Sequence, residues 1–307
     1  MKSGPDMSVN LAGIMMRNPV MVASGTFGYG VEYAGLVDIE QLGAIVVKGI
    51  RLEPCSGNPQ PRIVEVRSGL INSIGLQGPG VEGFIADYLP LLRRWNTPVI
   101  VNVWGTTLRE YAEVCGRLDG MPGVSGIELN VSCPNVKQGG LAFGSNPRMT
   151  ARVVAVARRK TRLPLFCKLA PNVPDIRVFA RAAEESGADG ISLVNSFPAM
   201  KIDVEKRAPV LGNVTGGLTG PAIHPIAVKL VRDAASAVSI PVVGMGGITD
   251  ADDALEFLIA GASAVAVGTA NFADPRTAIR VAAGIRSYLK RHGFGSVREI
   301  VGMLGTP

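Results

Sequence analysis

The feature that most constrains the fold of this chain is an alternation of short apolar runs with longer amphipathic segments, repeated eight times. The apolar runs are rich in β-branched residues and lack polar–apolar alternation, as expected for parallel strands buried on both faces. They predict strands at residues 19–24, 44–49, 98–103, 126–131, 164–169, 190–195, 241–246 and 264–268.

The segments between these strands predict helices, because their apolar residues recur at helical spacing. Pro147 and Pro275 occupy first helical positions, and Gly261 and Gly293 follow helix ends, which are the favoured places for proline and glycine. The predicted helices are residues 31–42, 81–95, 108–118, 147–160, 174–186, 221–237, 251–260 and 275–291.

Eight strand–helix units in unbroken order predict an α/β fold, a (β/α)₈ TIM barrel, with a doubly wound open sheet as the alternative. Residues 8–16 precede the first strand and predict an N-terminal hairpin at the bottom of the barrel. Two connections, residues 50–80 and 197–219, are long enough to predict functional insertions. We expect residues 1–307 to form a single domain.

Composition excludes several classes of protein. The 31 Lys and Arg residues exceed the 25 Asp and Glu residues by six, but they are scattered. Their densest clusters, 158–160 and 290–292, lie at predicted helix ends, where cations are favourable. Aromatic residues are only 5% of the chain, which argues against a surface on which the bases of single-stranded nucleic acid could stack. We therefore expect no nucleic-acid partner.

Membrane and metal classes are also disfavoured. Lys2 and Asp6 interrupt the first residues, and no apolar stretch reaches the length of a membrane span. We expect no membrane association, a cytoplasmic location and reduced cysteines. The cysteines are too far apart for a zinc or iron–sulfur framework, so no metal site is expected. They are Cys55, Cys115, Cys133 and Cys167.

Lysines lie where a barrel carries its chemistry, at the carboxyl ends of the strands. Lys48 and Lys168 fall within apolar runs. A buried ammonium group needs a partner or loses its charge, so a bound anion is a natural partner. The alternative is an internal ion pair. The strands carry few acidic residues that could form one, and Glu128 is the exception.

Glycine turns follow the last two strands, at Gly246-Gly247 and Gly268-Thr269. Barrels commonly bind phosphate at this position, because backbone amides and a helix N-terminus face the anion. The alternative is that the glycines only allow tight turns. The position predicts a phosphorylated ligand.

Cys133 follows the fourth strand in a loop of small and polar residues. A thiolate there can act as a nucleophile or a general base, and a base role is favoured because no histidine lies nearby to activate it. The alternative, a small buried hydrophobe, is expected for Cys115 and Cys167. We expect His224 to be a helix-capping or surface residue, and Cys55 to have no role.

Six motifs, taken together, resemble the dihydroorotate dehydrogenase family. They occur in order along nearly the whole chain. They are Lys48-Gly49, Asn72-Ser73-Ile74-Gly75-Leu76-Gln77, Asn130-Val131-Ser132-Cys133-Pro134-Asn135, Lys168-Leu169-Ala170-Pro171-Asn172, Thr215-Gly216-Gly217-Leu218-Thr219-Gly220 and Gly244-Met245-Gly246-Gly247-Ile248. The resemblance implies an FMN-binding (β/α)₈ barrel that oxidises (S)-dihydroorotate to orotate in pyrimidine biosynthesis.

The resemblance also implies residue roles. Cys133 matches the catalytic base, which removes the C5 proton while hydride passes from C6 to N5 of FMN. Lys48 would supply positive charge near flavin and substrate, and Lys168 would favour reduced flavin. Positions that match FMN contacts are Ser24, Lys48, Gly49, Asn102, Asn130, Lys168, Val194, Gly220, Gly246, Gly247, Gly268 and Thr269. Positions that match substrate contacts are Lys48, Asn72, Ser73, Ile74, Gly75, Leu76, Asn130, Asn195 and Ser196.

Residues 136–140 resemble the NAD⁺-linked class 1B catalytic subunit, whereas class 2 members carry serine at the position of Cys133 and a membrane extension. Class 1B implies a partner subunit carrying FAD and a [2Fe–2S] cluster, and a homodimer of catalytic subunits within a heterotetramer. This sequence has no cysteine cluster and no Rossmann glycine fingerprint, so those cofactors are expected on the partner. Gly78 departs from the asparagine frequent in relatives and is expected to alter a helix cap.

Other functions remain as alternatives at this point. On the same barrel, the chain could be a fumarate-linked class 1A enzyme or a dihydropyrimidine-type flavin reductase. A non-redox aldolase or isomerase would use Lys48 or Lys168 beside a phosphate. The net charge of +6 suggests, more weakly, a tRNA-binding flavin reductase.

Overall fold

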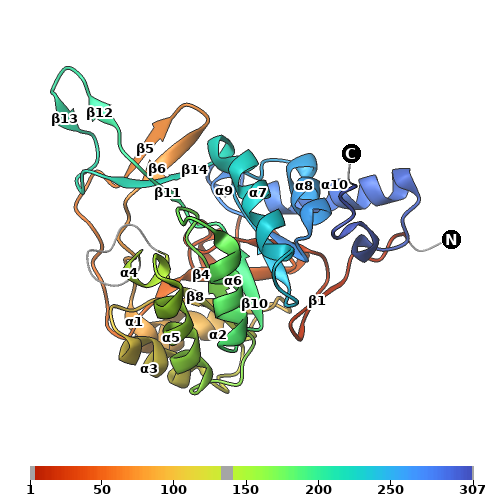
Figure 1. Ribbon diagram of the computed structural model, residues 1–307, viewed down its shortest axis with the longest axis horizontal. Coiled ribbons are helices and arrows are strands. Elements are labelled where there is room, and N and C mark those ends of the chain that lie inside the picture. The colour runs from red at the N-terminus through yellow and green to blue at the C-terminus, as the bar shows by residue number, and fades with distance from the viewer. Residues whose placement is uncertain (1–3, 133–140, 306–307) are drawn as a thin grey trace.

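A closed barrel of eight parallel strands forms the centre of the computed structural model, which describes residues 4–132 and 141–305 (Figure 1). Nearly all barrel-strand residues are buried, which explains their continuous apolar runs. The predicted (β/α)₈ barrel is confirmed. In sequence order the strands are β3 (Val20–Val22), β4 (Ala44–Ile50), β7 (Val99–Val103), β8 (Gly126–Asn130), β9 (Leu165–Lys168), β10 (Gly190–Leu193), β15 (Val242–Gly244) and β16 (Ala264–Val267).

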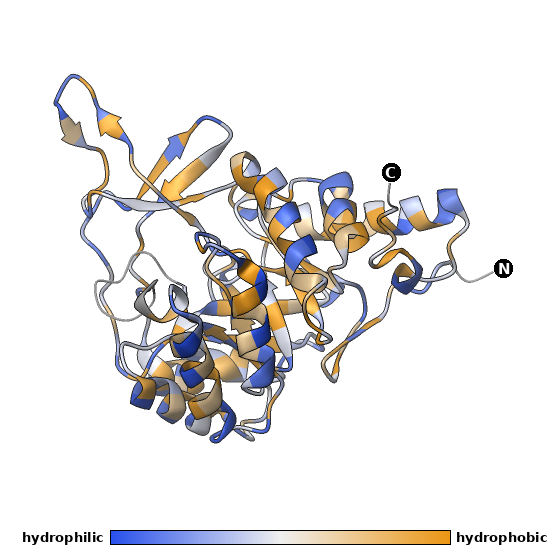
Figure 2. Ribbon diagram, in the orientation of Figure 1, coloured by the Kyte–Doolittle hydropathy of each residue, from blue (hydrophilic) through white to orange (hydrophobic). Residues whose placement is uncertain are grey.

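Helices surround the barrel, and Figure 2 shows hydrophobic and hydrophilic residues interspersed along them. Asn146 and Asp250 cap helix starts by accepting backbone N–H bonds, and Gly261 and Gly293 end helices in the left-handed conformation. The long helices are α3 (Leu108–Leu118), α5 (Pro147–Arg158), α6 (Ile176–Glu185), α7 (His224–Ala235), α8 (Ala251–Ala260) and α10 (Thr277–His292). Shorter turns are α4 (Leu141–Gly144), α9 (Ala270–Ala273), η4 (Pro221–Ile223) and η5 (Val297–Ile300).

Two predicted helices differ from the structure. Residues 31–42 form only two 3₁₀ turns, η1 (Val31–Tyr33) and η2 (Ile39–Gln41), because Asp38 starts a new turn by accepting the Glu40 N–H. Residues 81–95 are divided into three pieces. They are α1 (Gly80–Gly83), the π-helical turn η3 (Phe84–Tyr88) and α2 (Leu89–Leu92). Pro90 has no N–H to donate, so a regular α-helix cannot continue through it.

The N-terminal hairpin is confirmed. β1 (Val9–Leu11) pairs antiparallel with β2 (Ile14–Met16), and the apolar side chains of Leu11 and Met16 are buried. The hairpin packs against the start of β8, since a Cβ added to Gly126 would come within 2.8 Å of Ile14 Cδ1. It therefore closes the amino end of the barrel, opposite the strand ends that carry polar residues.

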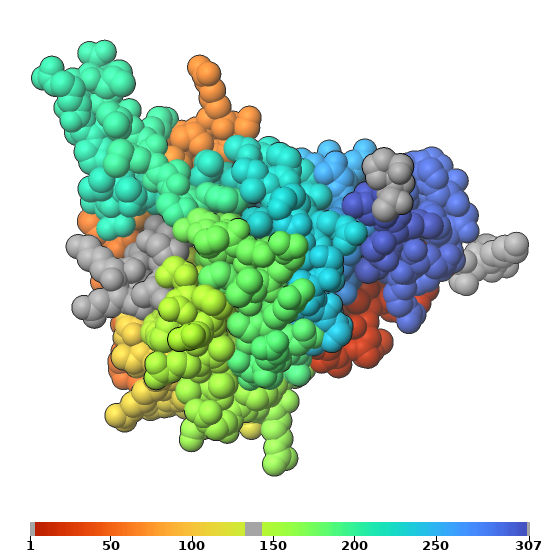
Figure 3. Space-filling view, viewed as in Figure 1, coloured from red at the N-terminus to blue at the C-terminus, as the bar shows by residue number. Residues whose placement is uncertain are grey.

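The two long insertions pair with each other into one antiparallel sheet, in the order β11-β14-β6-β5. Gly69 and Gly216 lie at this pairing, where added Cβ atoms would come within 2.2 Å and 2.5 Å of backbone oxygens on the facing strand. The strands are β5 (Ile63–Val66), β6 (Gly69–Asn72), β11 (Phe197–Ala199) and β14 (Gly216–Thr219). A further hairpin, β12 (Ile202–Asp203) and β13 (Ala208–Pro209), projects from the molecule (Figures 1 and 3).

Across residues 4–132 and 141–305, no helix has both the length and the apolar character needed to cross a bilayer.

Candidate functional site

One cavity of about 290 Å³ lies at the carboxyl ends of the barrel strands, beneath the insertion sheet. Its volume lies near the lower limit of ligand pockets, which is roughly 300 Å³. All twelve residues predicted to contact FMN line it. The predicted substrate residues line the same cavity, with the exception of Ser73.

One predicted site residue falls outside this cavity lining, and another is not among the residues that the structure describes. Ser73 is fully buried; its hydroxyl accepts a hydrogen bond from Asn58 (3.1 Å), and its N–H donates to the Arg62 carbonyl (2.7 Å). Ser73 therefore braces the insertion, and its contact with a substrate stays a prediction. Cys133, the predicted base, lies outside the residues that the structure describes.

The glycine turn after β15 packs directly on the start of α7. A Cβ at Gly246 would lie 2.7 Å from Ala227 Cβ, and one at Gly247 would lie 2.8 Å from His224 Cβ and 2.9 Å from the Gly220 carbonyl. Gly246 and Gly247 also have φ angles of 138° and 72°, which favour glycine. On their other side Gly246 and Gly247 line the cavity, as does the neighbouring Gly268, so their backbone groups are available to an anion there.

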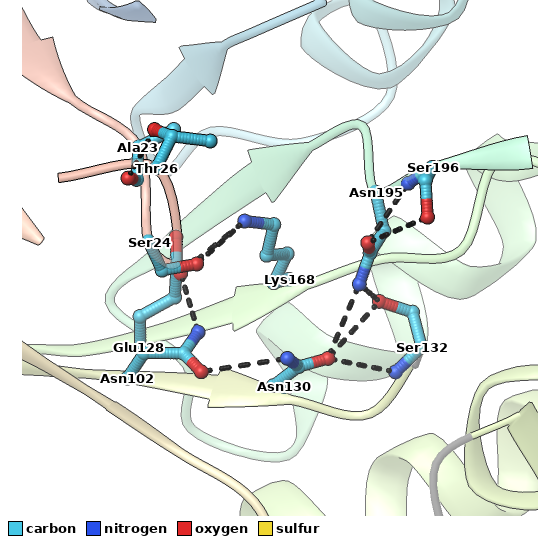
Figure 4. Close-up of polar contacts among 10 residues, drawn as sticks. All are labelled: Ala23, Ser24, Thr26, Asn102, Glu128, Asn130, Ser132, Lys168, Asn195 and Ser196. Atoms are coloured by element: carbon cyan, nitrogen blue, oxygen red, sulfur yellow. Dashed lines mark hydrogen bonds and ion pairs between the residues drawn. The ribbon is translucent and has the colours of Figure 1, made fainter. Parts of the chain in front are cut away.

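A chain of buried polar contacts crosses the floor of the cavity (Figure 4). Lys168 Nζ donates to Ser24 Oγ (3.1 Å) and lies 3.6 Å from Glu128 Oε1. The same carboxylate oxygen accepts a hydrogen bond from Asn102 Nδ2 at 2.7 Å, and Asn130 Nδ2 donates to Asn102 Oδ1 at 3.4 Å. Lys168 therefore has the internal partner that the sequence left as an alternative, while it also lines the cavity.

The amide of Asn195 continues this chain to the other side of the cavity. Its Nδ2 donates to Asn130 Oδ1 (3.2 Å) and Ser132 Oγ (2.8 Å), and its Oδ1 accepts the Ser196 N–H (2.8 Å). From α3, the Tyr111 hydroxyl donates to the Asn130 carbonyl at 2.8 Å. The amide groups are therefore oriented by the protein itself and offer both donors and acceptors to a ligand.

Lys48 differs from Lys168, because it makes no ion pair with any residue of the described ranges. Burial lowers the pKa of Lys48; Glu32 opposes this shift, and the Arg62 charge adds to it. An ammonium group at the cavity wall that makes no ion pair within the described residues is suited to an anionic ligand, which would favour its charged form.

Several lining residues were not predicted. Ile63, Leu70 and Phe272 contribute apolar surface, and Ile63 and Phe272 are about half exposed. Alternation of apolar and polar residues along the 50–80 insertion could have suggested Ile63 and Leu70. The position of Phe272 just after the Gly268-Thr269 turn could have suggested that residue.

Two minor expectations were wrong. His224 is not a surface residue, because it is buried, and its ring contacts Gly246 and Glu256 and does not cap a helix start. Gly78 does not cap a helix; it forms a two-bond backbone bridge with Cys55, and a Cβ there would lie 3.0 Å from the Tyr29 hydroxyl oxygen.

Three kinds of group lie at the same end of this parallel barrel: glycine turns suited to an anion, oriented amides, and ammonium groups. Together they define a barrel enzyme with a phosphorylated cofactor beside a polar substrate. The family model for dihydroorotate dehydrogenase matches residues 6–289, and the chain belongs to that family. Membership implies a flavin cofactor, FMN. Gly246 and Gly247 line the cavity with backbone alone, which is compatible with a phosphate group there.

The chain is similar to curated relatives along nearly its whole length. A dihydroorotate dehydrogenase B (NAD⁺) catalytic subunit from Pelobacter propionicus is 55% identical over 300 residues, covering 98% of this chain and 99% of the relative. One of the same description from Geotalea daltonii is 53% identical, with 98% of each chain covered. The fold resembles DHODH from Eimeria tenella, crystallised with ferulenol, with TM-score 0.83, 24% identity, and 98% and 89% coverage of the two chains.

The buried pair of Lys168 and Glu128 generates a stability prediction. Lys168→Met leaves an uncompensated buried carboxylate, and we expect the free energy of unfolding of the apoprotein to fall by about 3–5 kcal/mol. Adding Glu128→Gln to that variant should recover most of the loss. Urea denaturation measures both values.

Lys229→Met is the control, because it removes a lysine from the exposed pair with Asp233 and should cost less than about 1 kcal/mol. A double variant as unstable as Lys168→Met alone would show that Lys168 and Glu128 are not energetically coupled.

Proposed function

We propose that this chain is a catalytic subunit that oxidises (S)-dihydroorotate to orotate in pyrimidine biosynthesis. The observation that carries the proposal is a single cavity lined by the glycine turns, Lys48 and the amides of Asn72, Asn130 and Asn195. These groups match a ligand set of one phosphorylated cofactor and one small planar acid with amide edges. The curated relatives named for this reaction cover almost the whole chain.

The residues that would hold FMN divide into two groups along the cavity. Backbone groups of the glycine turns would hold the phosphate; these are Gly220, Gly246, Gly247, Gly268 and Thr269. Side chains and backbone near the polar floor would hold the ring system; these are Ser24, Lys48, Gly49, Asn102, Asn130, Lys168 and Val194. Bound FMN supplies the acceptor for the hydride that leaves C6 of the substrate.

The remaining residues would bind the substrate and move its proton. Asn72, Asn130 and Asn195 would pair with the amide edges, while the Lys48 ammonium group would face the carboxylate. Ser196 and the segment Ile74, Gly75 and Leu76 would complete the wall. Cys133 would accept the C5 proton as the C5–C6 double bond forms, so the substrate loses one proton and one hydride.

An anaerobic reduction experiment tests the reaction and the base together. Adding dihydroorotate to the FMN-loaded protein should bleach the flavin absorbance and release orotate. Cys133→Ala should keep FMN bound and slow the bleaching by a factor on the order of 10²–10⁴, the usual contribution of a general base. Stopped-flow absorbance measures the rate.

Cys115→Ala is the matched control, since that thiol is buried in α3 and does not line the cavity. Its bleaching rate should stay near wild type. Near-normal reduction of Cys133→Ala would remove Cys133 as the base, and no bleaching of the wild type would reject the proposed substrate.

The lowered pKa of Lys48 generates a pH prediction. Orotate is an anion and should bind better when Lys48 is charged. The affinity of the protein for orotate should therefore fall as the pH rises through the pKa of Lys48, which is lowered from the usual ~10.4. Lys48→Gln should bind orotate more weakly and lose this alkaline decline. Titrating orotate against the flavin spectrum at saturating FMN measures both effects.

Lys229→Gln, on the exposed face of α7, should keep the wild-type alkaline profile. An unchanged profile in Lys48→Gln would mean that another group, or orotate itself, controls the decline.

We further propose that the electrons leave through a partner chain. The relatives are named catalytic subunits, which implies a second subunit. The four cysteines are dispersed along the sequence, so we place FAD and a [2Fe–2S] cluster on the partner, in a heterotetramer built on a homodimer of catalytic subunits. Residues 1–307 would act as one domain in the cytoplasm, where thiols such as Cys55 stay reduced.

The isolated chain should therefore be bleached by dihydroorotate yet reduce NAD⁺ at a small fraction of that rate, with fumarate also a poor acceptor. Multiple-turnover assays at 340 nm, a wavelength at which NADH absorbs, measure this difference. Rapid NAD⁺ reduction by the chain alone would contradict the need for a partner, and efficient use of fumarate would favour the class 1A alternative.

A further inference from the structure

His224 links the glycine turn after β15 to helix α8. It is the first residue of α7, and its side chain is 11% exposed. Its Nδ1 lies 3.0 Å from the Gly246 carbonyl oxygen. On the other side of the ring, Nε2 lies 3.1 Å from Glu256 Oε2 and 3.7 Å from Asp253 Oδ1.

Both ring nitrogens of His224 therefore face acceptors. A backbone carbonyl and an ionised carboxylate have no proton to donate, and a neutral imidazole carries only one N–H. The imidazolium form, with two N–H groups, satisfies both neighbours at once. The ring packs edge-on against Phe257, with centroids 5.2 Å apart, so its orientation is restricted.

Holding the Gly246 carbonyl also determines the direction of the next amide. The peptide bond between Gly246 and Gly247 is trans, and the C=O and N–H of a trans peptide point to opposite sides. With the carbonyl held toward His224, the Gly247 N–H is directed away from α7. Gly247 lines the cavity, and its N–H donates to no other backbone group of the described chain.

We propose that His224 is a positioning residue for the phosphate end of the cofactor site. Its imidazolium holds the Gly246–Gly247 peptide so that the Gly247 N–H donates to the flavin phosphate, and Glu256 and Asp253 hold the imidazolium. The inference rests on FMN as the cofactor of the proposed function, but not on the substrate. It predicts selectivity for a phosphorylated flavin over the same flavin without phosphate.

The test compares FMN with riboflavin, which lacks the phosphate. Dissociation constants for the apoprotein are measured by quenching of flavin fluorescence. His224→Gln retains a side-chain N–H but cannot bridge both neighbours, and we expect FMN binding to weaken by about 10-fold to 100-fold, as for a lost charge-assisted contact. Riboflavin binding should be unchanged, so the selectivity ratio falls.

Two further measurements keep the outcome clear. His292→Gln is the matched control, because His292 is exposed at the end of α10, and it should leave both constants unchanged. Glu256→Gln keeps an acceptor for Nε2 but removes the charge that holds the imidazolium, so it should lower the FMN-to-riboflavin selectivity by a smaller factor. The ³¹P resonance of bound FMN should shift in His224→Gln and not in the control.

Equal weakening of FMN and riboflavin in His224→Gln would overturn the proposal, because His224 would then support the whole pocket. Unchanged binding of both would also overturn it. The binding measurements do not depend on dihydroorotate oxidation. If the chain bound FMN selectively through His224 but did not oxidise dihydroorotate, only the proposed substrate would be refuted.

Discussion

The burial of Lys168 with Glu128 is the constraint on which the polar end of the barrel depends. Both side chains lie within the strand layer, where an isolated charge is strongly unfavourable. Their pairing at 3.6 Å leaves Glu128 Oε1 to accept from Asn102, and that bond starts the row of oriented amides through Asn130 to Asn195. This row of polar groups can then exist inside an apolar barrel, because its side chains are hydrogen-bonded to one another before any ligand binds.

The insertion sheet converts the open end of the barrel into a covered cavity. Neither insertion could form a stable sheet alone, since an isolated hairpin is marginal in water. Pairing β6 with β14 joins segments about 145 residues apart, as the contact between Asn72 and Gly217 illustrates. It brings Asn72 and the apolar Ile63 and Leu70 over the strand ends. The lining of the cavity therefore combines residues from the strand ends with residues from this cover.

Close backbone approach explains why glycine is concentrated at this end. At Gly246 and Gly247 a side chain would collide with α7, and at Gly69 and Gly216 it would collide with the facing strand. The first pair allows the start of α7 to pack on a turn that also lines the cavity, and the second allows the cover to pair. In both places the glycines serve packing between elements as well as local turn geometry.

The sequence alone determined the barrel and most of the residues that line the cavity, because eight apolar runs have few other stable arrangements and barrel strands place their carboxyl ends together. It could not show the sheet formed by the two insertions, the Lys168–Glu128 pair or the contacts of His224, because each joins residues distant in the chain. It also could not show that Ser73 braces the insertion, because a polar side chain suits a ligand and a buried hydrogen bond equally well. Local pattern decides which elements form, whereas only tertiary packing decides which polar groups satisfy one another and which are left to face the cavity.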